Sequence, residues 1–449
     1  MKDLTKGKEF KLILMFALPM LIGNVFQQMY NIVDSAIVGN YIGKQALASV
    51  GASFPIIFLL ISLIIGVTIG ATIIISQYFG AKQFSDVRKA VDTINIILLI
   101  TAIFIAAIGI VFSREIFILI GLPKDIISYA VEYLQIFLLG LPFMFGFQGI
   151  SAVLRGVGDT KTPLYFLIIS TVLNVILDLI FVITFKFGVA GVAWATIISQ
   201  AVALTSAIIW VHKNKMLNFR IKGIVFDLNI FKKSIKIGLP SGMQQTFVAL
   251  GLMAVLGIVN QFGTDVIAAY SAAMRIDSLA MLPAMVFSTA LSGFVGQNIG
   301  ANKLDRVKKG LYSTLIMTVV VSIIITIFIV IYGNSMMSLF TNDTEVIRIG
   351  MEYLVIVSSF YVIFAIMFTI NGVMRGAGDT IVPMFITLIA LWGVRIPVAY
   401  FLSLNIGEKG IWWSMPLAWF VGMVLTFIYY KTKRWKKKSV ISKSAKTIE

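Results

Sequence analysis

Twelve apolar stretches, each bounded by charged residues, glycine or proline, constrain this chain more than any other feature. A run of about 20 apolar residues crosses the hydrocarbon core of a bilayer as an α-helix. With 59% hydrophobic and 13% charged residues, the chain has too little polar surface for a soluble protein of 449 residues. The sequence therefore predicts an all-α polytopic membrane protein. We place its transmembrane helices near residues 12–37, 50–78, 91–112, 129–153, 163–185, 191–211, 235–260, 273–298, 311–332, 349–373, 383–404 and 411–430.

The net charge of +17 follows a membrane topology rather than a nucleic-acid site. Most of the 37 Lys and Arg residues lie in the amino terminus, in every second loop and in the carboxyl terminus. Because cytoplasmic loops are enriched in Lys and Arg, this alternation predicts that both termini are cytoplasmic. We expect a multi-pass protein of a bacterial-type inner membrane whose basic tail lies on anionic lipid headgroups. No nucleic-acid partner is expected.

The chain repeats itself at an offset of 220 residues. The sequence LRGVGDTKTP (154–163) recurs as MRGAGDTIVP (374–383), and QYFGAKQFSDVRKA (77–90) matches QNIGANKLDRVKKG (297–310) at the same offset. Several matches in one register indicate a duplication. Since each half holds an even number of spans, the two halves enter the membrane from the same side and the repeat is parallel.

The longest polar segment divides the chain between these halves. We predict an amino-terminal six-helix lobe at 1–211, a cytoplasmic linker at 212–234, a carboxyl-terminal six-helix lobe at 235–430 and a basic cytoplasmic tail at 431–449.

Polar residues inside apolar helices are costly, so each is a functional hypothesis. The first helix carries Asn24, Gln27, Asn31 and Asp34, whose spacing places them on one face. This face is expected to lie toward a cavity or the bundle interior. Interhelical hydrogen bonding explains the Asn and Gln residues as well as substrate contact does. For Asp34 we favour a functional role.

The fifth helix follows the same logic. Asn174 and Asp178 are i, i+4 neighbours, and Ser170 lies one turn earlier on the same face. Burial and a like-charged neighbour both disfavour a charged carboxylate. Two carboxylates in one desolvated bundle would therefore share a proton, or hold one Na⁺ through oxygen ligands.

These motifs resemble the multidrug and toxic compound extrusion (MATE) family. The resemblance rests on the duplicated R-G-x-G-D-T, the Q-x-x-G-A loop, the LP pairs at 18–19 and 239–240, and VDSAIVG at 33–39. It covers nearly the whole chain. It implies two six-helix bundles that form a V around a central cavity, with export driven by a proton or sodium gradient.

The DinF-like branch of this family uses an Asp on the first helix and an N-x-x-x-D pair on the fifth. Asp34, Asn174 and Asp178 match these positions, and Thr196 matches a Thr that assists on the sixth helix. The resemblance thus implies that these four residues couple transport to H⁺ or form a Na⁺ site. Tyr133 corresponds to a Tyr that lines the lobe.

Two further positions bear on this resemblance. A Pro at the spacing of Pro19 bends the first helix in that branch when the Asp is protonated, so we expect Pro19 to be a conformational kink; a static helix-start proline is the alternative. Ser151 stands where the branch carries Asn, which leaves a sodium site incomplete.

The second half carries fewer candidates. Gln244 and Gln245 lie on the inner part of the seventh helix, and no carboxylate follows them there. The NorM-like branch has acids where Val248 and Phe364 stand here, so the resemblance leaves ion coupling to the first half. The expected substrate cavity residues are Gln27, Asn31, Tyr133, Gln244 and Gln245.

Two more charged positions need an explanation. Arg395 lies midway along the eleventh helix, where it requires a partner, a water-filled cavity or a headgroup. Its role is left open between a structural pair and a substrate contact. Arg275 and Asp277, near the start of the eighth helix, are expected at the membrane interface.

We predict a secondary antiporter that exports amphipathic, cationic organic compounds in exchange for H⁺ or Na⁺. A flippase or exporter of a lipid-linked or specialised metabolite is the alternative, although such cargo favours several cavity Arg or Lys residues. An enzyme is not expected, because the chain has no Cys, one His and no Ser-His-Asp set. We expect no cofactor, a small-molecule substrate, contacts with membrane lipids and a monomer.

Overall fold

The computed structural model describes residues 2–213 and 224–441. Within these ranges it leaves undescribed the side chains of Asn31, Lys44, Gln45, Leu47, Leu63 and Asp125. The described residues form helices joined by turns and short loops, and no strand occurs among them. The predicted all-α class is therefore confirmed. Parts of the predicted linker (214–223) and of the predicted tail (442–449) lie outside the described residues.

The described chain divides into two compact units. Unit 1 holds Lys2, Leu18–Phe79 and Gln83–Leu239, and unit 2 holds Asp3–Ala17, Gly80–Lys82 and the described residues from Pro240 onward. Residues 3–17 thus pack with the second half of the sequence, whereas we predicted them as part of the amino-terminal lobe at 1–211.

Two helices have a long segment in each unit. Helix α1 (Glu9–Ile37) begins in unit 2 and continues in unit 1, whereas α8 (Leu228–Val259) begins in unit 1 and continues in unit 2. Both change unit at a Leu-Pro pair, Leu18-Pro19 and Leu239-Pro240. Since proline removes one backbone hydrogen bond, each helix is weakened where it leaves its unit.

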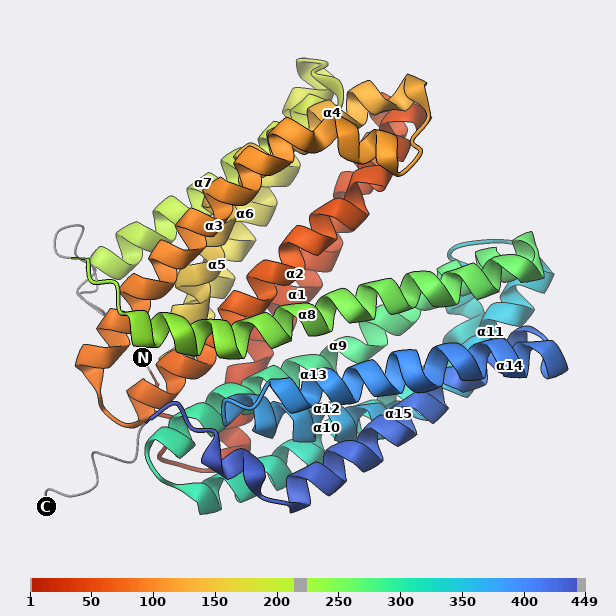
Figure 1. The fold of residues 1–449 in the computed structure, drawn as a ribbon. Coiled ribbons are helices and arrows are strands. Elements are labelled where there is room, and N and C mark those ends of the chain that lie inside the picture. The colour runs from red at the N-terminus through yellow and green to blue at the C-terminus, as the bar shows by residue number, and fades with distance from the viewer. Residues whose placement is uncertain (1, 214–223, 442–449) are drawn as a thin grey trace, which may run out of the picture. The chain divides into compact units, whose positions relative to one another are not determined.

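The other helices of each unit follow in chain order (Figure 1). Unit 1 contains the π-helical turn η1 (Val38–Ile42), α2 (Lys44–Gly80), α3 (Phe84–Leu119), α4 (Lys124–Leu139), α5 (Leu141–Gly156), α6 (Lys161–Leu179), the π-helical turn η2 (Ile180–Thr184) and α7 (Gly188–Lys213). Unit 2 contains η3 (Asn260–Phe262), α9 (Thr264–Gly300), α10 (Leu304–Met337), α11 (Thr344–Ser358), α12 (Tyr361–Gly376), α13 (Ile381–Leu388), the π-helical segment η4 (Ile389–Arg395), α14 (Ile396–Ile406), α15 (Glu408–Lys431) and η5 (Arg434–Lys437).

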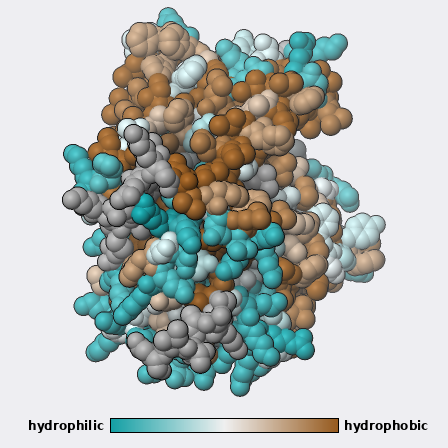
Figure 2. Space-filling model, turned by 60° about the vertical axis from the view of Figure 1, so that its left-hand side comes forward, coloured by the Kyte–Doolittle hydropathy of each residue, from teal (hydrophilic) through white to brown (hydrophobic). Residues whose placement is uncertain are grey.

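Ten helices of the described chain are long and apolar enough to cross a membrane, and two bent helix pairs bring the number to twelve. Large apolar side chains point outward from them, such as Val111 and Leu404, each 68% exposed. Figure 2 shows hydrophobic residues over much of one face of the molecule. Because lipid offers no hydrogen bonds, the helical backbone must satisfy its own polar groups, and these apolar side chains suit hydrocarbon.

The two bent pairs were expected as single helices at 129–153 and 349–373. The structure divides the first into α4 and α5, with a 46° bend, and the second into α11 and α12, with a 48° bend. Pro142 lies in the first turn of α5, where its missing N–H breaks the helical ladder of α4. The two bends lie at equivalent places in the two halves.

The backbone repeats as the sequence does. Gly158 and Gly378, in the two RGxGDT turns, have φ of +86° and +93°, and Lys82 and Asn302 have φ of 60° and 58°. Each pair is separated by the 220-residue offset. A left-handed backbone conformation is uncommon for Lys, so its recurrence as Asn302 confirms a structural duplication.

The acid of the RGxGDT turn has different partners in the two halves. Asp159 accepts hydrogen bonds from the backbone N–H groups of Lys161 and Thr162, both at 3.1 Å, and so caps the first turn of α6. Asp379 instead accepts from the hydroxyl of Tyr429 on α15 at 2.5 Å. The same turn therefore caps a helix in unit 1 and binds a neighbouring helix in unit 2.

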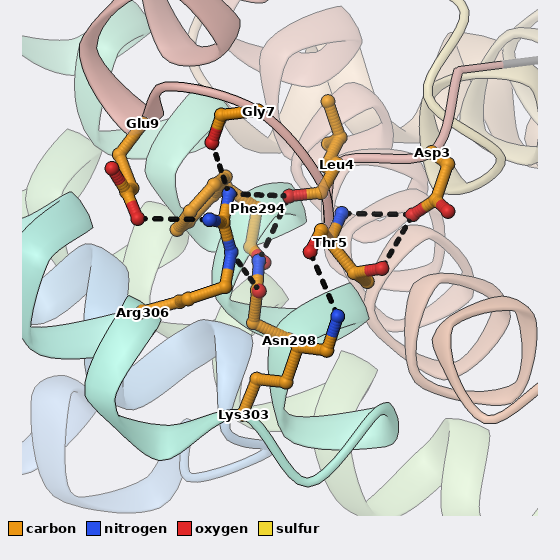
Figure 3. A network of polar contacts seen from close by, with 9 residues as sticks. All are labelled: Asp3, Leu4, Thr5, Gly7, Glu9, Phe294, Asn298, Lys303 and Arg306. Carbon is orange, nitrogen blue, oxygen red and sulfur yellow. Dashed lines mark hydrogen bonds and ion pairs between the residues drawn. The ribbon is translucent and has the colours of Figure 1, made fainter.

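Residues 3–9 form an arm that is bound to α9 and α10 within unit 2 (Figure 3). Arg306 donates to the carbonyl oxygen of Gly7 at 2.9 Å and forms an ion pair with Glu9 at 2.9 Å. Asn298 and Lys303 donate to the carbonyl oxygens of Leu4 and Thr5, at 3.2 and 3.0 Å. These side chains bind the arm mainly through its backbone carbonyl oxygens, and the side chain of Leu4 is fully buried.

Asp3 stabilises the start of this arm. It accepts from the backbone N–H and the hydroxyl of Thr5 at 2.8 and 2.6 Å. Burial raises the pKa of Asp3, but the bonds from Thr5 and the charges of Lys6 and Lys303 lower it by more, so its pKa lies below the usual value of 3.8. The stabilisation of the folded arm by the charged Asp3 carboxylate is complete at neutral pH. It is lost only as the pH falls through the lowered pKa.

Arg306→Ala should release the arm. The variant loses the Glu9 ion pair and leaves the Gly7 carbonyl without its donor, at a cost of about 2 kcal/mol for charged hydrogen bonds. We expect the Leu4 amide to exchange with deuterium about 30-fold faster. Hydrogen exchange followed by mass spectrometry measures this, with Lys308→Ala on the same exposed helix turn as the control. Unchanged protection of residues 3–9 would contradict the described arm.

Candidate ion-coupling site

Asp34 on α1 and Asp178 on α6 lie against each other inside unit 1, with their carboxyl groups in hydrogen-bonding contact. Asp178 is fully buried, and Asp34 is partly buried. The Oδ1 atom of each carboxyl is enclosed and has no hydrogen-bond partner among the described residues. Two charged carboxylates repel strongly in a low-dielectric interior, so this contact requires a proton or a cation between them.

A hydrogen-bond network from three helices surrounds the acidic pair. With its amide oriented toward complementary partners, Asn174 donates from Nδ2 to Oδ2 of Asp178 at 3.0 Å and accepts at Oδ1 from the Thr196 backbone N–H at 3.2 Å. The Thr196 hydroxyl on α7 donates to the Val192 carbonyl and lies 3.1 Å from the hydroxyl of Tyr30 on α1. Helices α1, α6 and α7 are thereby joined at the site.

Tyr133 on α4 approaches the pair from another direction. It is buried, its hydroxyl interacts electrostatically with both Asp34 and Asp178, and its ring stacks on Phe137 with centroids 6.4 Å apart. The structure therefore brings together Asp34, Tyr133, Asn174, Asp178 and Thr196, five residues that lie far apart in the sequence.

A cavity of about 10 Å³ lies beside this network and has room for one water molecule. It is lined by Gln27, Tyr30, Leu167, Ser170, Thr171, Asn174, Thr196, Ser199 and Gln200. The side-chain oxygen of Gln200 is buried without a partner among the described residues. A polar cavity of this size can hydrate the site, and a water there would satisfy Gln200.

Two π-helical turns follow the acids along the chain. The turn η1 (Val38–Ile42) continues α1 after Asp34, and η2 (Ile180–Thr184) continues α6 after Asp178. Single π-helical turns inside α-helices often mark functional sites, because the extra residue redirects the side chains around it. The sequence carried no signal for either turn.

The other expected cavity residues lie elsewhere. Gln244 in unit 2 donates to the hydroxyl of Thr387 at 2.6 Å, and Gln245 beside it is partly buried. Asn24 is exposed and donates to the carbonyl oxygen of Met20 in its own helix. The side chain of Asn31 lies outside the described residues.

Pro19 and Ser151 were singled out by the family resemblance. Pro19 lies inside α1, which continues as a helix through it. Ser151 on α5 is buried, and its hydroxyl has no partner in the part of the chain that the structure describes. Neither residue belongs to the hydrogen-bond network around the acidic pair.

Unit 2 holds a buried carboxylate that the sequence placed wrongly. Asp277 was expected at the interface, yet it is 1% exposed and accepts from the hydroxyls of Tyr361 and Tyr353 at 2.5 and 3.2 Å. Arg395, at the end of η4, is also buried, and its charge acts on Asp277. The arginine thus has a counter-charge within its own unit, which favours a structural pair.

Thr196→Val tests the network with a small change of shape. Removal of the hydroxyl leaves Tyr30 without its partner, and an unsatisfied buried hydroxyl costs about 1–3 kcal/mol. We expect a severalfold loss in apparent affinity for the coupling ion, measured as the ion concentration that gives half-maximal transport. Thr196→Ser keeps the hydroxyl and should behave as the wild type. Equal losses in both variants would mean that packing, and not the hydrogen bond, matters here.

The comparisons with known proteins agree with the repeat. The MatE family model matches residues 19–180 and again residues 240–401. The chain belongs to the MatE family. It is 32% identical to "Probable multidrug resistance protein YpnP" of Bacillus subtilis over 437 residues, which cover 97% of each chain. It is 28% identical to "Probable multidrug resistance protein NorM" of Thermotoga maritima over 96% of this chain and 94% of that one.

Solved structures show the same fold. "Crystal structure of MATE in the straight conformation" superposes with a TM-score of 0.91 at 22% identity and covers 97% of this chain and 98% of that one. A MOP superfamily transporter from Pyrococcus furiosus gives a TM-score of 0.90 at 22% identity over 96% and 97% of the two chains. The family predicted from the duplicated motifs is confirmed. The protein is a multi-pass membrane transporter of the MatE family and not an enzyme.

Proposed function

We propose that this MatE transporter is a secondary antiporter that exports amphipathic, cationic organic compounds in exchange for a monovalent cation bound at Asp34 and Asp178. The observation that carries this proposal is the contact between the two carboxyl groups inside unit 1. Buried carboxylates in a membrane protein are expensive and mark ion pathways. The pair gives the protein one place where a cation changes the charge of its interior.

One shared proton is sufficient to hold the two carboxyl groups in contact, whereas Na⁺ favours several oxygen ligands. In the amide orientation that gives Asn174 complementary partners, its nitrogen, a donor, lies toward Asp178. In this orientation Oδ2 of Asp178 accepts from Asn174, and one proton shared between Asp34 and Asp178 accounts for the contact of the two carboxyl groups. A Na⁺ ion would instead fit the other amide orientation, in which the oxygen of Asn174 lies toward Asp178, together with the hydroxyl of Thr196.

The charge of the cargo follows from the same acids. Loss of the shared proton leaves negative charge at the site, which favours a cationic molecule. In unit 2, by contrast, the buried Asp277 carboxylate is offset by the charge of the buried Arg395. Relatives whose names describe multidrug resistance support amphipathic drugs or toxic metabolites as cargo.

Coupling can act through α1, because this helix carries both Pro19 and Asp34. About 22 Å of helix separates the two residues, at 1.5 Å per residue. A change in the contact between Asp34 and Asp178 alters the packing of α1 on α6, and Pro19 is the position where α1 bends at the lowest cost. Alternate protonation and cargo binding would then switch the access of the site.

The positions of the Lys and Arg residues support an orientation with both termini in the cytoplasm of a bacterial-type cell. In that orientation the arm at residues 3–9 and the turns after Gly80, Gly156, Gly300 and Gly376 face the cytoplasm. The helix starts at Lys124, Thr264, Thr344 and Glu408 face outward.

Purified protein in vesicles tests this function. Uptake of a fluorescent lipophilic cation is followed with a proton or a sodium gradient imposed separately, in wild type and Asp34→Asn. We expect uptake under the proton gradient and none in the variant. Uptake driven only by the sodium gradient would mean that the coupling ion is Na⁺ and not H⁺. Equal activity of Asp34→Asn, or translocation of a lipid-linked sugar without cation transport, would overturn the antiporter.

A further inference from the structure

Unit 2 contains a cavity of about 530 Å³ where α10, α11 and α15 begin or end. It is lined by Asn334, Thr344, Ile347, Arg348, Met351, Glu352, Val355, Ile356 and Lys409. Asn334 lies near the end of α10, Thr344 is the first residue of α11, and Lys409 is the second of α15. These helices are candidate membrane spans, so the cavity lies at the level of the lipid headgroups.

Charges of alternating sign form one wall. Arg348 binds Glu345 at 2.6 Å and Glu352 at 2.9 Å, and Lys409 binds Glu352 at 3.3 Å. Glu408 also acts electrostatically on Arg348, so three acids and two bases lie together here and leave one net negative charge, which favours a ligand with an ammonium group. The other oxygen of Glu352, Oε2, has no hydrogen-bond partner among the described residues. This oxygen is enclosed, so a ligand in the cavity meets Oε1 of Glu352 and the exposed carboxylate of Glu345.

Apolar side chains line the neighbouring face of the same helix, α11. Ile347, Met351 and Val355 follow one another at i, i+4 and i+8 along α11, so they make one stripe about 12 Å long. Leu339 and Phe340, in the turn after α10, are exposed at the same end of the unit. A ligand that fills the cavity therefore needs both a zwitterionic group and an apolar chain.

We propose that this cavity binds phosphatidylethanolamine. Glu352 and Glu345 accept hydrogen bonds from the lipid ammonium, Arg348 and Lys409 hold its phosphate, and one acyl chain lies along Met351 and Val355. The volume is in the usual range for small-molecule sites. A choline headgroup has no N–H to donate, and phosphatidylglycerol has no cation for the acids.

The existing ion pairs do not oppose this binding. The side chains of Arg348, Glu345 and Lys409 are 50%, 51% and 50% exposed, and exposed ion pairs are nearly balanced by hydration. Exchange of one partner for a lipid group of the same charge therefore has a small cost. Burial of the acyl chain supplies net affinity.

Native mass spectrometry of the purified full-length protein tests the site. Phosphatidylethanolamine, its N-methylated and N,N-dimethylated forms, phosphatidylcholine and phosphatidylglycerol are added separately with identical acyl chains. We expect one retained phosphatidylethanolamine per protein, with retention falling at each methylation as donors are removed. Equal retention of all five lipids, or a preference for phosphatidylglycerol, would overturn the proposal. No ion gradient is used, so the result is independent of the transport activity.

Variants assign the binding to the cavity. Glu352→Gln and Arg348→Gln should each weaken phosphatidylethanolamine binding about tenfold, which corresponds to 1.4 kcal/mol. Ile347→Trp, which places a large ring in the path of the acyl chain, should weaken binding further. Lys89→Gln removes a similarly exposed ion pair in unit 1, with Asp86 at 3.8 Å, and should change nothing. Unchanged binding in Arg348→Gln, or an equal loss in Lys89→Gln, would refute the assignment to this cavity.

Discussion

Asp178→Asn is expected to abolish gradient-driven export while cargo binding is retained. Asn has nearly the shape of Asp, and Asn174 still has an oxygen to donate to, so the fold around α6 is kept. The variant, however, cannot exchange a proton at this position. We therefore expect cation accumulation to fall to the level of protein-free vesicles.

Two measurements separate this loss from misfolding. Equilibrium binding of the fluorescent cation to detergent-solubilised protein should remain within a fewfold of the wild type. Asp86→Asn, which removes an exposed acid paired with Lys89, should accumulate cargo as the wild type does. Accumulation at the wild-type rate in Asp178→Asn would show that the coupling ion binds elsewhere, whereas loss of both binding and transport would make Asp178 a structural residue.

Much of the fold could be predicted because each transmembrane helix is a local feature. A helix in lipid satisfies its own backbone, so the length and hydropathy of one segment predict one span. The predicted helices at 91–112 and 411–430 fall within α3 and α15. The repeat was equally clear, since matching turns require matching residues such as Gly158 and Gly378.

Long-range features could not be predicted in this way. No local pattern shows that residues 3–17 pack in unit 2, because that depends on donors from Asn298 and Arg306, almost 300 positions away. Asp277 was placed at the interface because its position along the helix was the only guide. Its burial depends on Tyr353 and Tyr361, which a single helix does not reveal.

The candidate site could be predicted from the sequence only in part. Helical spacing predicts that Asn174 and Asp178 share a face, but the contact with Asp34 depends on how α1 packs on α6. Tyr30 and Gln200 were missed. Tyr30 is four residues before Asp34, and Gln200 is four residues after Thr196, so the same i, i+4 spacing would have identified both.

Gly80→Ala should destabilise the protein although alanine favours helices. Gly80 ends α2, and a Cβ there would lie 2.0 Å from the carbonyl oxygen of Gln297 and 2.7 Å from its Cα. These are backbone atoms of α9 and cannot rotate away. The gain in helix propensity is about 1 kcal/mol. Overpacking against a rigid neighbour costs about 1–3 kcal/mol or more, so we expect a net loss and a lower melting temperature.

Gly51→Ala in the same helix is the matched control. No atom lies within 4 Å of its added Cβ, so only the propensity term remains and the melting temperature should rise slightly. Opposite signs for one substitution in one helix would assign the loss at Gly80 to its contact with Gln297. A Gly80→Ala variant that melts at or above the wild-type temperature would contradict this packing.

The same variant should also disturb the amino-terminal arm. The side chain of Gln297 accepts the Leu4 backbone N–H at 2.9 Å, so a shift of Gln297 away from a Cβ at position 80 moves that acceptor. We therefore expect the Leu4 amide to exchange faster in Gly80→Ala, as in Arg306→Ala, and to stay protected in Gly51→Ala. Destabilisation by Gly80→Ala with full protection of Leu4 would mean that the turn after α2 and the arm contact α9 independently.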